Sequence, residues 1–122
     1  MKYLLIMHMN PAIMESLSKT EMDEIMSGHE EFMKTITESG EMISTHALAD
    51  VSNTVVVRVR NGLPAVTDGP YLEAKEYLGG YYLVDVESKE RAIELAALIP
   101  DAKVDGLGVE VRPVMFSAGQ DM

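Results

Sequence analysis

Residues 20–40, TEMDEIMSGHEEFMKTITESG, form the stretch that decides the fold. Apolar side chains recur there at spacings of three and four, which is the periodicity of one face of an α-helix. We expect Thr20 to cap this helix with Asp23 as its capping-box partner, and Gly40 to end it in the left-handed conformation. The helix therefore has one apolar face to bury, made of Met22, Ile25, Met26, His29, Phe32, Met33 and Ile36.

Outside this helix the apolar pattern is typical of β-strands. Asn61-Gly62 predicts a tight hairpin, because both turn positions require positive φ. The returning strand, residues 63–67, contains Pro64 and is therefore expected at a sheet edge. Ser88 and Pro100 bound a second helix, which is expected to turn Ala92, Leu95, Ala96 and Ile99 inward. The remaining strands are predicted at residues 2–9, 42–49, 54–60, 81–86 and 109–112.

The order of these elements predicts an α+β domain of the ferredoxin-like βαββαβ type, with the hairpin as an insertion. Helices of this motif cover one face of the sheet. The first strand is apolar on both faces, and we assign Val56, Tyr82 and Val84 to the uncovered face. A second copy is the simplest cover, so a face-to-face homodimer is predicted. Residues 1–122 are expected to form one domain, with 117–122 as a flexible tail.

Composition excludes several classes of partner. The formal net charge is −10, and the ten Lys and Arg residues are scattered, so binding to nucleic acid or to an anionic membrane is not expected. The chain has no cysteine, which excludes disulfides, thiolate metal sites and cysteine nucleophiles. No apolar run approaches the length of a membrane span or a signal-peptide core. We therefore expect a cytoplasmic protein.

His29 is the first candidate for chemistry, since it stands in the apolar stripe of the long helix. A histidine that faces the interior needs partners for its ring nitrogens. One interpretation is a core histidine bonded to a backbone carbonyl. The other is a general acid/base whose second ring nitrogen is held by a carboxylate.

Asp68 is the candidate carboxylate, in the turn that precedes Gly69-Pro70. An aspartate there commonly bonds the backbone of its own turn, which is the alternative. If Asp68 instead held the His29 ring, it would fix the tautomer and raise the basicity of the imidazole. The sequence leaves both interpretations open.

Residues 67–83, TDGPYLEAKEYLGGYYL, resemble the signature of the YCII-related proteins, specifically the branch called DGPF-domain proteins. Residues 1–4, Gly28-His29, Val57-Arg58 and residues 109–115 also match that branch in order and spacing, so the resemblance covers nearly the whole chain. Tyr71 replaces the signature Phe, and Leu72 stands where a smaller residue is usual. Both departures are expected to reshape a pocket without removing an ionisable group.

The resemblance implies a dimeric α+β barrel, in which two ferredoxin-like units pack sheet to sheet. It also implies that His29 and Asp68 correspond to the suspected active-site pair of the family. Related barrels include isomerases and lyases that act on small cyclic or ring-derived compounds, and monooxygenases that need no metal. Some DGPF-domain proteins are associated with extracytoplasmic-function sigma factors, which implies a regulatory alternative.

The remaining candidates are ligand contacts near Asp68, namely Tyr71, Glu73, Lys75 and Tyr81. Surface charge is the alternative for Glu73 and Lys75. Tyr81 and Tyr82 point to opposite faces of one strand, so only one of them can face a given pocket. Arg112 is expected either to bind an anion or to form a cross-strand ion pair. His8, His29 and His46 have no metal-ligand spacing, and we expect neither a metal nor a cofactor.

Three hypotheses follow. The first is a cofactor-free, isomerase- or lyase-like enzyme in which His29 is the general acid/base and Asp68 orients it. The second is a ligand-binding or regulatory module that uses the same pocket without turnover. The third is a structural dimer in which His29 is only a core residue.

Overall fold

The computed structural model describes residues 1–71 and 74–119 of the chain. Two short 3₁₀ helices, η1 (Val51–Asn53) and η2 (Pro100–Lys103), accompany the longer elements. The longer elements are β1 (Lys2–Met9), α1 (Pro11–Ser16), α2 (Lys19–Glu38), β2 (Met42–Ala47), β3 (Val55–Arg60), β4 (Leu63–Asp68), β5 (Tyr77–Asp85), α3 (Lys89–Leu98) and β6 (Val109–Pro113).

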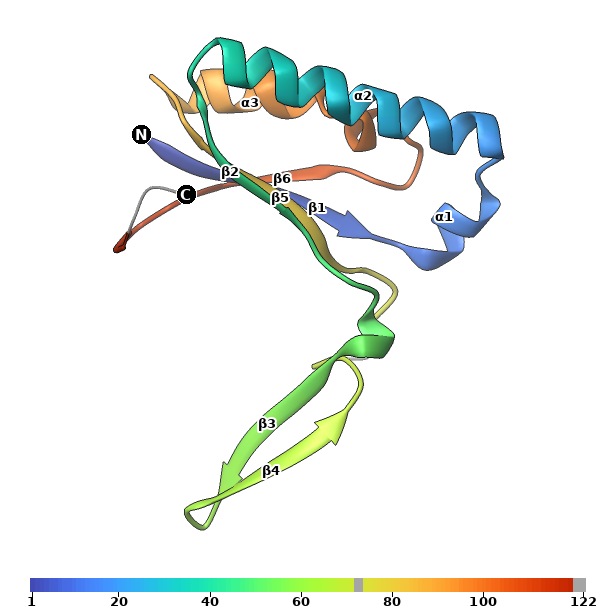
Figure 1. Cartoon of the computed structure of the whole chain (residues 1–122), viewed down its shortest axis with the longest axis vertical. Coiled ribbons are helices and arrows are strands. Elements are labelled where there is room, and N and C mark those ends of the chain that lie inside the picture. The colour runs from blue at the N-terminus through green and yellow to red at the C-terminus, as the bar shows by residue number, and fades with distance from the viewer. Residues whose placement is uncertain (72–73, 120–122) are drawn as a thin grey trace.

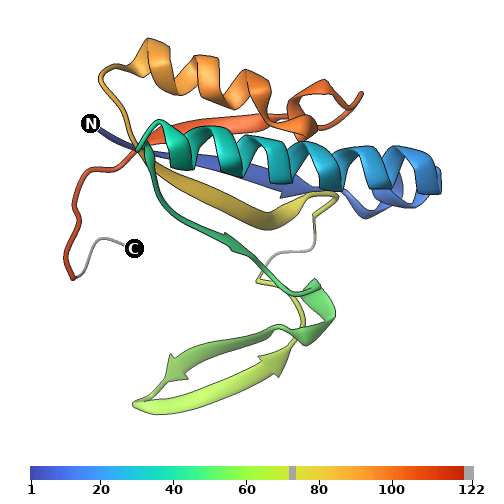
Figure 2. The same cartoon turned by 45° about the horizontal axis from the view of Figure 1, so that its top comes forward.

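A four-stranded antiparallel sheet has the order β2-β5-β1-β6, and α2 and α3 lie together over one of its faces (Figures 1 and 2). Strands β3 and β4 form a separate two-stranded sheet between β2 and β5 in the chain. Leaving out this insertion, the order of elements is βαββαβ with β1 in the interior of the sheet. The predicted α+β, ferredoxin-like fold with an inserted hairpin is confirmed.

Helix α2 begins two residues earlier than the sequence pattern predicted. Its N-cap is Ser18, whose hydroxyl accepts from the Glu21 backbone N–H while the Glu21 carboxylate accepts from the Ser18 backbone N–H. The prediction of Thr20 with Asp23 was wrong, because the longer glutamate side chain reaches back to the cap backbone in this reciprocal bond. At the other end Gly40 has φ +81°, as predicted.

The core lies between the two helices and the sheet. All four residues predicted to face inward from the second helix, Ala92, Leu95, Ala96 and Ile99, are buried there. Phe32 and Ile36 are the buried residues of α2, whereas Met26 at the edge of the predicted stripe is exposed.

Tyr82 and Val84 belong to this core, so their assignment to the uncovered face was wrong. Val56 was also misassigned, because it lies in the inserted hairpin. Side chains alternate between the two faces along β5, so residues 82 and 84 point to the same face. Val86, just after the strand, continues this alternation and belongs to the same buried core as the α3 residues. The uncovered face instead carries Leu4, Ile6, Tyr81 and Leu83, which the strand register places opposite one another in pairs.

The hairpin turn is formed by Asn61 and Gly62, with φ of +53° and +76°, which confirms the predicted tight turn. Pro64 lies in β4, which has only one neighbouring strand, so the missing N–H costs no ladder bond in the sheet interior. Figures 1 and 2 show the hairpin projecting from the body on the side of the sheet opposite α2 and α3.

Within the described residues, no helix has both the length and the hydropathy needed to cross a bilayer. Residues 117–119 have no helix or strand, and the rest of the predicted tail, 120–122, lies outside the described residues.

Candidate functional site

His29 projects from α2 and hydrogen-bonds through both ring nitrogens. Its Nδ1 lies 2.7 Å from the hydroxyl of Tyr82 on β5, and its Nε2 lies 2.7 Å from Oδ1 of Asp101 in η2. The His29 and Tyr82 rings are nearly parallel, with centroids 5.9 Å apart. Helix, sheet and η2 therefore each contribute one member of a three-residue chain, Asp101–His29–Tyr82.

A glycine brings α2 and η2 close enough for this contact. A Cβ added to Gly28 would lie 2.4 Å from Cγ of Pro100, so only glycine fits against the proline ring. Gly28 and Pro100 directly precede His29 and Asp101 in the sequence. Close packing of Gly28 against Pro100 thus brings His29 and Asp101 together.

The donor and acceptor capacities of the three side chains set the direction of each hydrogen bond. An ionised carboxylate only accepts, so His29 donates from Nε2 to Asp101. In the neutral imidazole Nδ1 is then the acceptor, and the Tyr82 hydroxyl donates to it. Burial, with a smaller contribution from the negative charge of Asp101, raises the pKa of Tyr82 to about 12. The phenol therefore remains protonated at neutral pH and can donate this bond.

Asp68 lies at the exposed end of β4, at the root of the hairpin. Within one chain, Asp101 and not Asp68 is the carboxylate bonded to His29. A catalytic role for Asp68 stays a prediction. Gly69 beside it donates its backbone N–H to the Thr54 carbonyl, which closes the hairpin root.

The predicted ligand contacts do not gather around His29. The Tyr71 ring is exposed, and the Arg58 guanidinium carbon lies over it, 5.4 Å from the ring centroid. Lys75 is also exposed. Tyr81 faces the uncovered side of the sheet beside His46, whereas Tyr82 on the opposite face contacts His29. Glu73 lies outside the described residues.

Asp101 and Tyr82 are the two site residues that sequence reasoning missed. Strand alternation was the available signal for Tyr82. Residues 82 and 84 point to the same face of a strand, and Val84 faces the helices. Asp101 had no comparable signal. It is 72 residues from His29, and only the packing of η2 against α2 brings them together.

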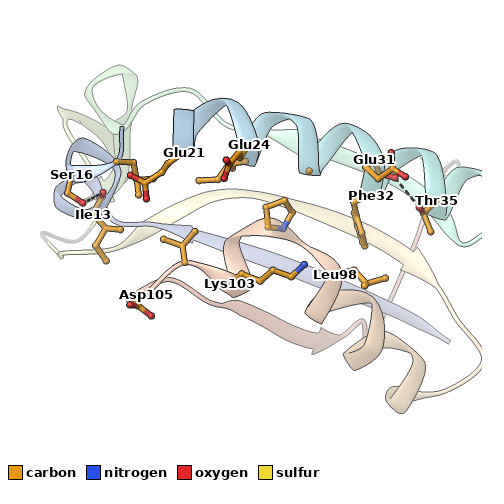
Figure 3. Close-up of a pocket in the computed structure, with 15 residues that line it drawn as sticks. Ile13, Ser16, Glu21, Glu24, Glu31, Phe32, Thr35, Leu98, Lys103 and Asp105 are labelled. Atoms are coloured by element: carbon orange, nitrogen blue, oxygen red, sulfur yellow. Dashed lines mark hydrogen bonds between the residues drawn. The ribbon is translucent and has the colours of Figure 1, made fainter. Parts of the chain in front are cut away.

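A groove of about 790 Å³ runs along the outer side of the α2–η2 contact (Figure 3). Ile25, Phe32 and Leu98 supply apolar surface, and Gly28 and Pro100 also line it. Its charged lining residues are Glu21, Glu24, Glu31, Lys103 and Asp105. His29 and Asp101 do not line the groove, so the Gly28–Pro100 contact separates it from the three-residue chain.

A second histidine–carboxylate pair lies on the uncovered face of the sheet. His8 Nε2 is 2.7 Å from Oε1 of Glu110, and Arg112 donates to the other oxygen of the same carboxylate. Hydrogen bonds from His8 and then Arg112 lower the pKa of Glu110. Arg112 therefore has an ion-pair partner, as one alternative predicted, but that partner is two residues away on its own strand. The described residues contain no group of three side chains arranged to hold a metal ion.

Comparison with known proteins identifies one relative and one protein family that resemble this chain over nearly its whole length. Uncharacterized protein R00369 of Rhizobium meliloti (strain 1021) is 27% identical to it over 121 residues, which cover 98% of each chain. The model of the YCII-related domain matches residues 1–116, a span that includes α2, η2 and every strand. This chain therefore belongs to the YCII-related family.

Proposed function

We propose that this protein is a cofactor-free enzyme that moves a proton on a small organic molecule, with His29 as its general acid/base. The observation that carries the proposal is the 2.7 Å contact between His29 Nε2 and Asp101. The side chains of both residues are about one-fifth exposed, which leaves them partly accessible. A carboxylate on one ring nitrogen holds the other nitrogen ready to accept a proton.

In the proposed step, the Tyr82 hydroxyl accepts a proton from substrate carbon while it passes its own proton to His29 Nδ1. Asp101 stabilises the imidazolium that forms, and the reverse transfer returns a proton to the isomerised or eliminated product. Because the phenol is never ionised, the raised pKa of Tyr82 does not oppose this relay. Substrate is proposed to bind in the α2–η2 groove and to reach Tyr82 when the Gly28–Pro100 contact opens.

A non-catalytic ligand-binding module is the second candidate. The observation that favours it is that both ring nitrogens of His29 are bonded within the chain and Tyr82 is only 2% exposed. A histidine used in this way would hold α2 on η2 and the sheet, and the groove would bind a molecule without changing it.

Proton exchange in D₂O separates the two candidates. A panel of small cyclic ketones and unsaturated lactones is incubated with the protein, and loss of C–H signals is followed by ¹H NMR. We expect deuteration of at least one compound by the wild type, and a rate at least about 100-fold lower in His29→Gln and in Tyr82→Phe. Asp101→Asn is expected to slow exchange and to change the ring ¹⁵N shifts of His29, which report its tautomer.

His8→Gln is the matched control, because His8 also pairs with a carboxylate at 2.7 Å, on the opposite face of the sheet. It is expected to keep the wild-type exchange rate. A compound that shows binding by saturation transfer but is never deuterated would establish the binding module. Equal exchange rates in His29→Gln and the wild type would overturn the acid/base role.

Asp68, Tyr71 and Lys75 near the hairpin root, with Tyr81 on β5, are proposed as additional ligand contacts, as is Glu73, which lies outside the described residues. The proposal is supported by the resemblance of residues 67–83 to the signature of the DGPF-domain proteins. Asp68→Asn in the same exchange assay tests it: an unchanged rate and unchanged saturation transfer would remove Asp68 from the site.

We also propose that the protein is a homodimer. The support is the sheet face that α2 and α3 leave uncovered (Figure 2), where Leu4 and Leu83 lie opposite each other and are each only partly buried. Burial of such a face by a second copy removes apolar surface from water on both partners. Sedimentation equilibrium gives the mass directly, and a monomer at all concentrations would contradict the proposal.

A further inference from the structure

The inserted hairpin, here called the arm (residues 55–68), exposes an apolar face that none of the described residues covers. Val55, Val57, Val59 and Val66 are each more than half exposed. Strand register puts Val57 opposite Val66 and Val59 opposite Pro64, so these side chains share one face of the ribbon. Isolated two-stranded hairpins are marginally stable in water. The arm therefore needs a surface to pack against.

We infer that the arm packs against a second copy of this chain, an inference that rests on the proposed homodimer. The arm projects on the same side of the molecule as the uncovered sheet face (Figures 1 and 2). A copy seated on that face lies beside the arm. In a two-fold dimer the contact is reciprocal, so each arm holds the other subunit.

Charge favours a second copy as the occupant. The charged residues of the arm are Arg58, Arg60 and Asp68, which give it a formal charge of +1. The other 108 residues carry a charge of −11, so the whole chain has a net charge of −10. Arg60 has no ion-pair partner among the described residues, and Arg58 lies over the Tyr71 ring. A weakly basic arm on an acidic body complements another body of the same chain.

Interface size gives a second argument. Four strands about 4.8 Å apart and about 20 Å long present a sheet face of roughly 400 Å². A stable interface buries about 800 Å² on each partner, so the sheet face alone supplies roughly half of that area. One face of the arm adds roughly 200 Å², and the partner's arm covers about as much again, which brings the burial to the standard size.

The test compares two double variants of the full chain by sedimentation equilibrium. Val57→Gln with Val66→Gln makes the apolar face of the arm polar, and Ala65→Gln with Thr67→Gln places the same amides on its exposed opposite face. We expect the first pair to raise the dimer dissociation constant at least about tenfold and the second pair to raise it less than about threefold.

Failure of the arm inference is distinguishable from failure of the dimer. A wild-type monomer at all concentrations overturns both. A dimer that both double variants leave equally tight overturns the arm inference alone. Hydrogen exchange of the wild type needs no variant: amides of β3 and β4 are expected to exchange faster after dilution below the dissociation constant. Exchange that is independent of concentration would also overturn the arm inference.

Discussion

His29 is a histidine placed among core residues with no polar atom left unpaired. Its ring is bonded at both nitrogens, and the described residues contain no buried side-chain nitrogen or oxygen without a partner. An unpaired buried polar group costs about 1–3 kcal/mol, so the two bonds offset the penalty of placing an imidazole beneath α2. The same two bonds set the tautomer, and the structural and chemical roles of His29 are therefore coupled.

Tyr82 provides a prediction at the scale of one residue. Its pKa is about 12 in the folded chain, against about 10 in the unfolded chain. A raised folded pKa contributes stability that is complete below about pH 10 and is lost as the pH rises toward about 12. Over that window the wild type is expected to lose on the order of 2 kcal/mol more stability than Tyr82→Phe.

Urea unfolding of both proteins between pH 9 and 12 measures this difference, and absorbance near 295 nm follows the phenol itself. Subtraction of the Tyr82→Phe titration from that of the wild type isolates Tyr82. A midpoint near pH 10 in the difference curve would show that the hydroxyl is not buried as described.

At the scale of elements, the contact between α2 and η2 decides whether the site exists. Helix α3 ends before Pro100, and the chain turns at once into η2, which carries Asp101. Ser18 and Glu21 fix the start of α2. A bidentate pair from Arg91 of α3 to Glu41, at 2.8 and 2.9 Å, fastens the second helix near the end of the first. These local contacts bring Gly28 against Pro100.

Gly28→Ala is expected to break this arrangement. Alanine gains roughly 1 kcal/mol in helix propensity. The new Cβ, however, would overlap the Pro100 ring at 2.4 Å, and such overpacking costs about 1–3 kcal/mol. The expected net result is a chain less stable by about 1 kcal/mol, measured by urea unfolding, with the His29 Nε2 proton signal altered because η2 has moved.

Gly108→Ala serves as the control, since an added Cβ there meets no atom within 4 Å and the backbone needs no positive φ. Its stability is expected to change by less than about 0.5 kcal/mol. An unchanged His29 spectrum in Gly28→Ala would mean that the glycine does not position the pair.

The whole molecule is asymmetric in its exposed surface. One side is closed by α2 and α3, and the other carries the open sheet face and the arm. Met115 and Phe116, which follow β6, add two further exposed apolar side chains. Apolar surface of this extent is unusual on a monomer and is typical of a face that binds a partner.

Association then links stability to concentration. If two chains fold as a dimer, the thermal midpoint is expected to rise with protein concentration, because mass action favours the bound state. Calorimetry over a hundredfold range of concentration measures the shift. The Val57→Gln, Val66→Gln variant is expected to melt at a lower temperature at high concentration and to approach the wild type on dilution. A midpoint that does not depend on concentration would argue for a folded monomer.

Local signals in the sequence determined most of the fold. The stripe of residues 22–36, the Asn61-Gly62 turn, the left-handed Gly40 and the inward residues of α3 were all predictable, because each depends on neighbours within a few positions. His29 was predictable as an interior histidine for the same reason. Ser18 was missed as the helix cap although its capping box is equally local.

Tertiary structure decided which residues meet. The pairing of His29 with Asp101 depends on α2 crossing η2 at a glycine, across 72 residues of chain. Which face of β5 carries Tyr82 was set by the core that β1, α2 and α3 build together. Hydrophobic periodicity gives each element a buried side, but only the packing of all elements selects the polar atoms that lie within 3 Å of one another.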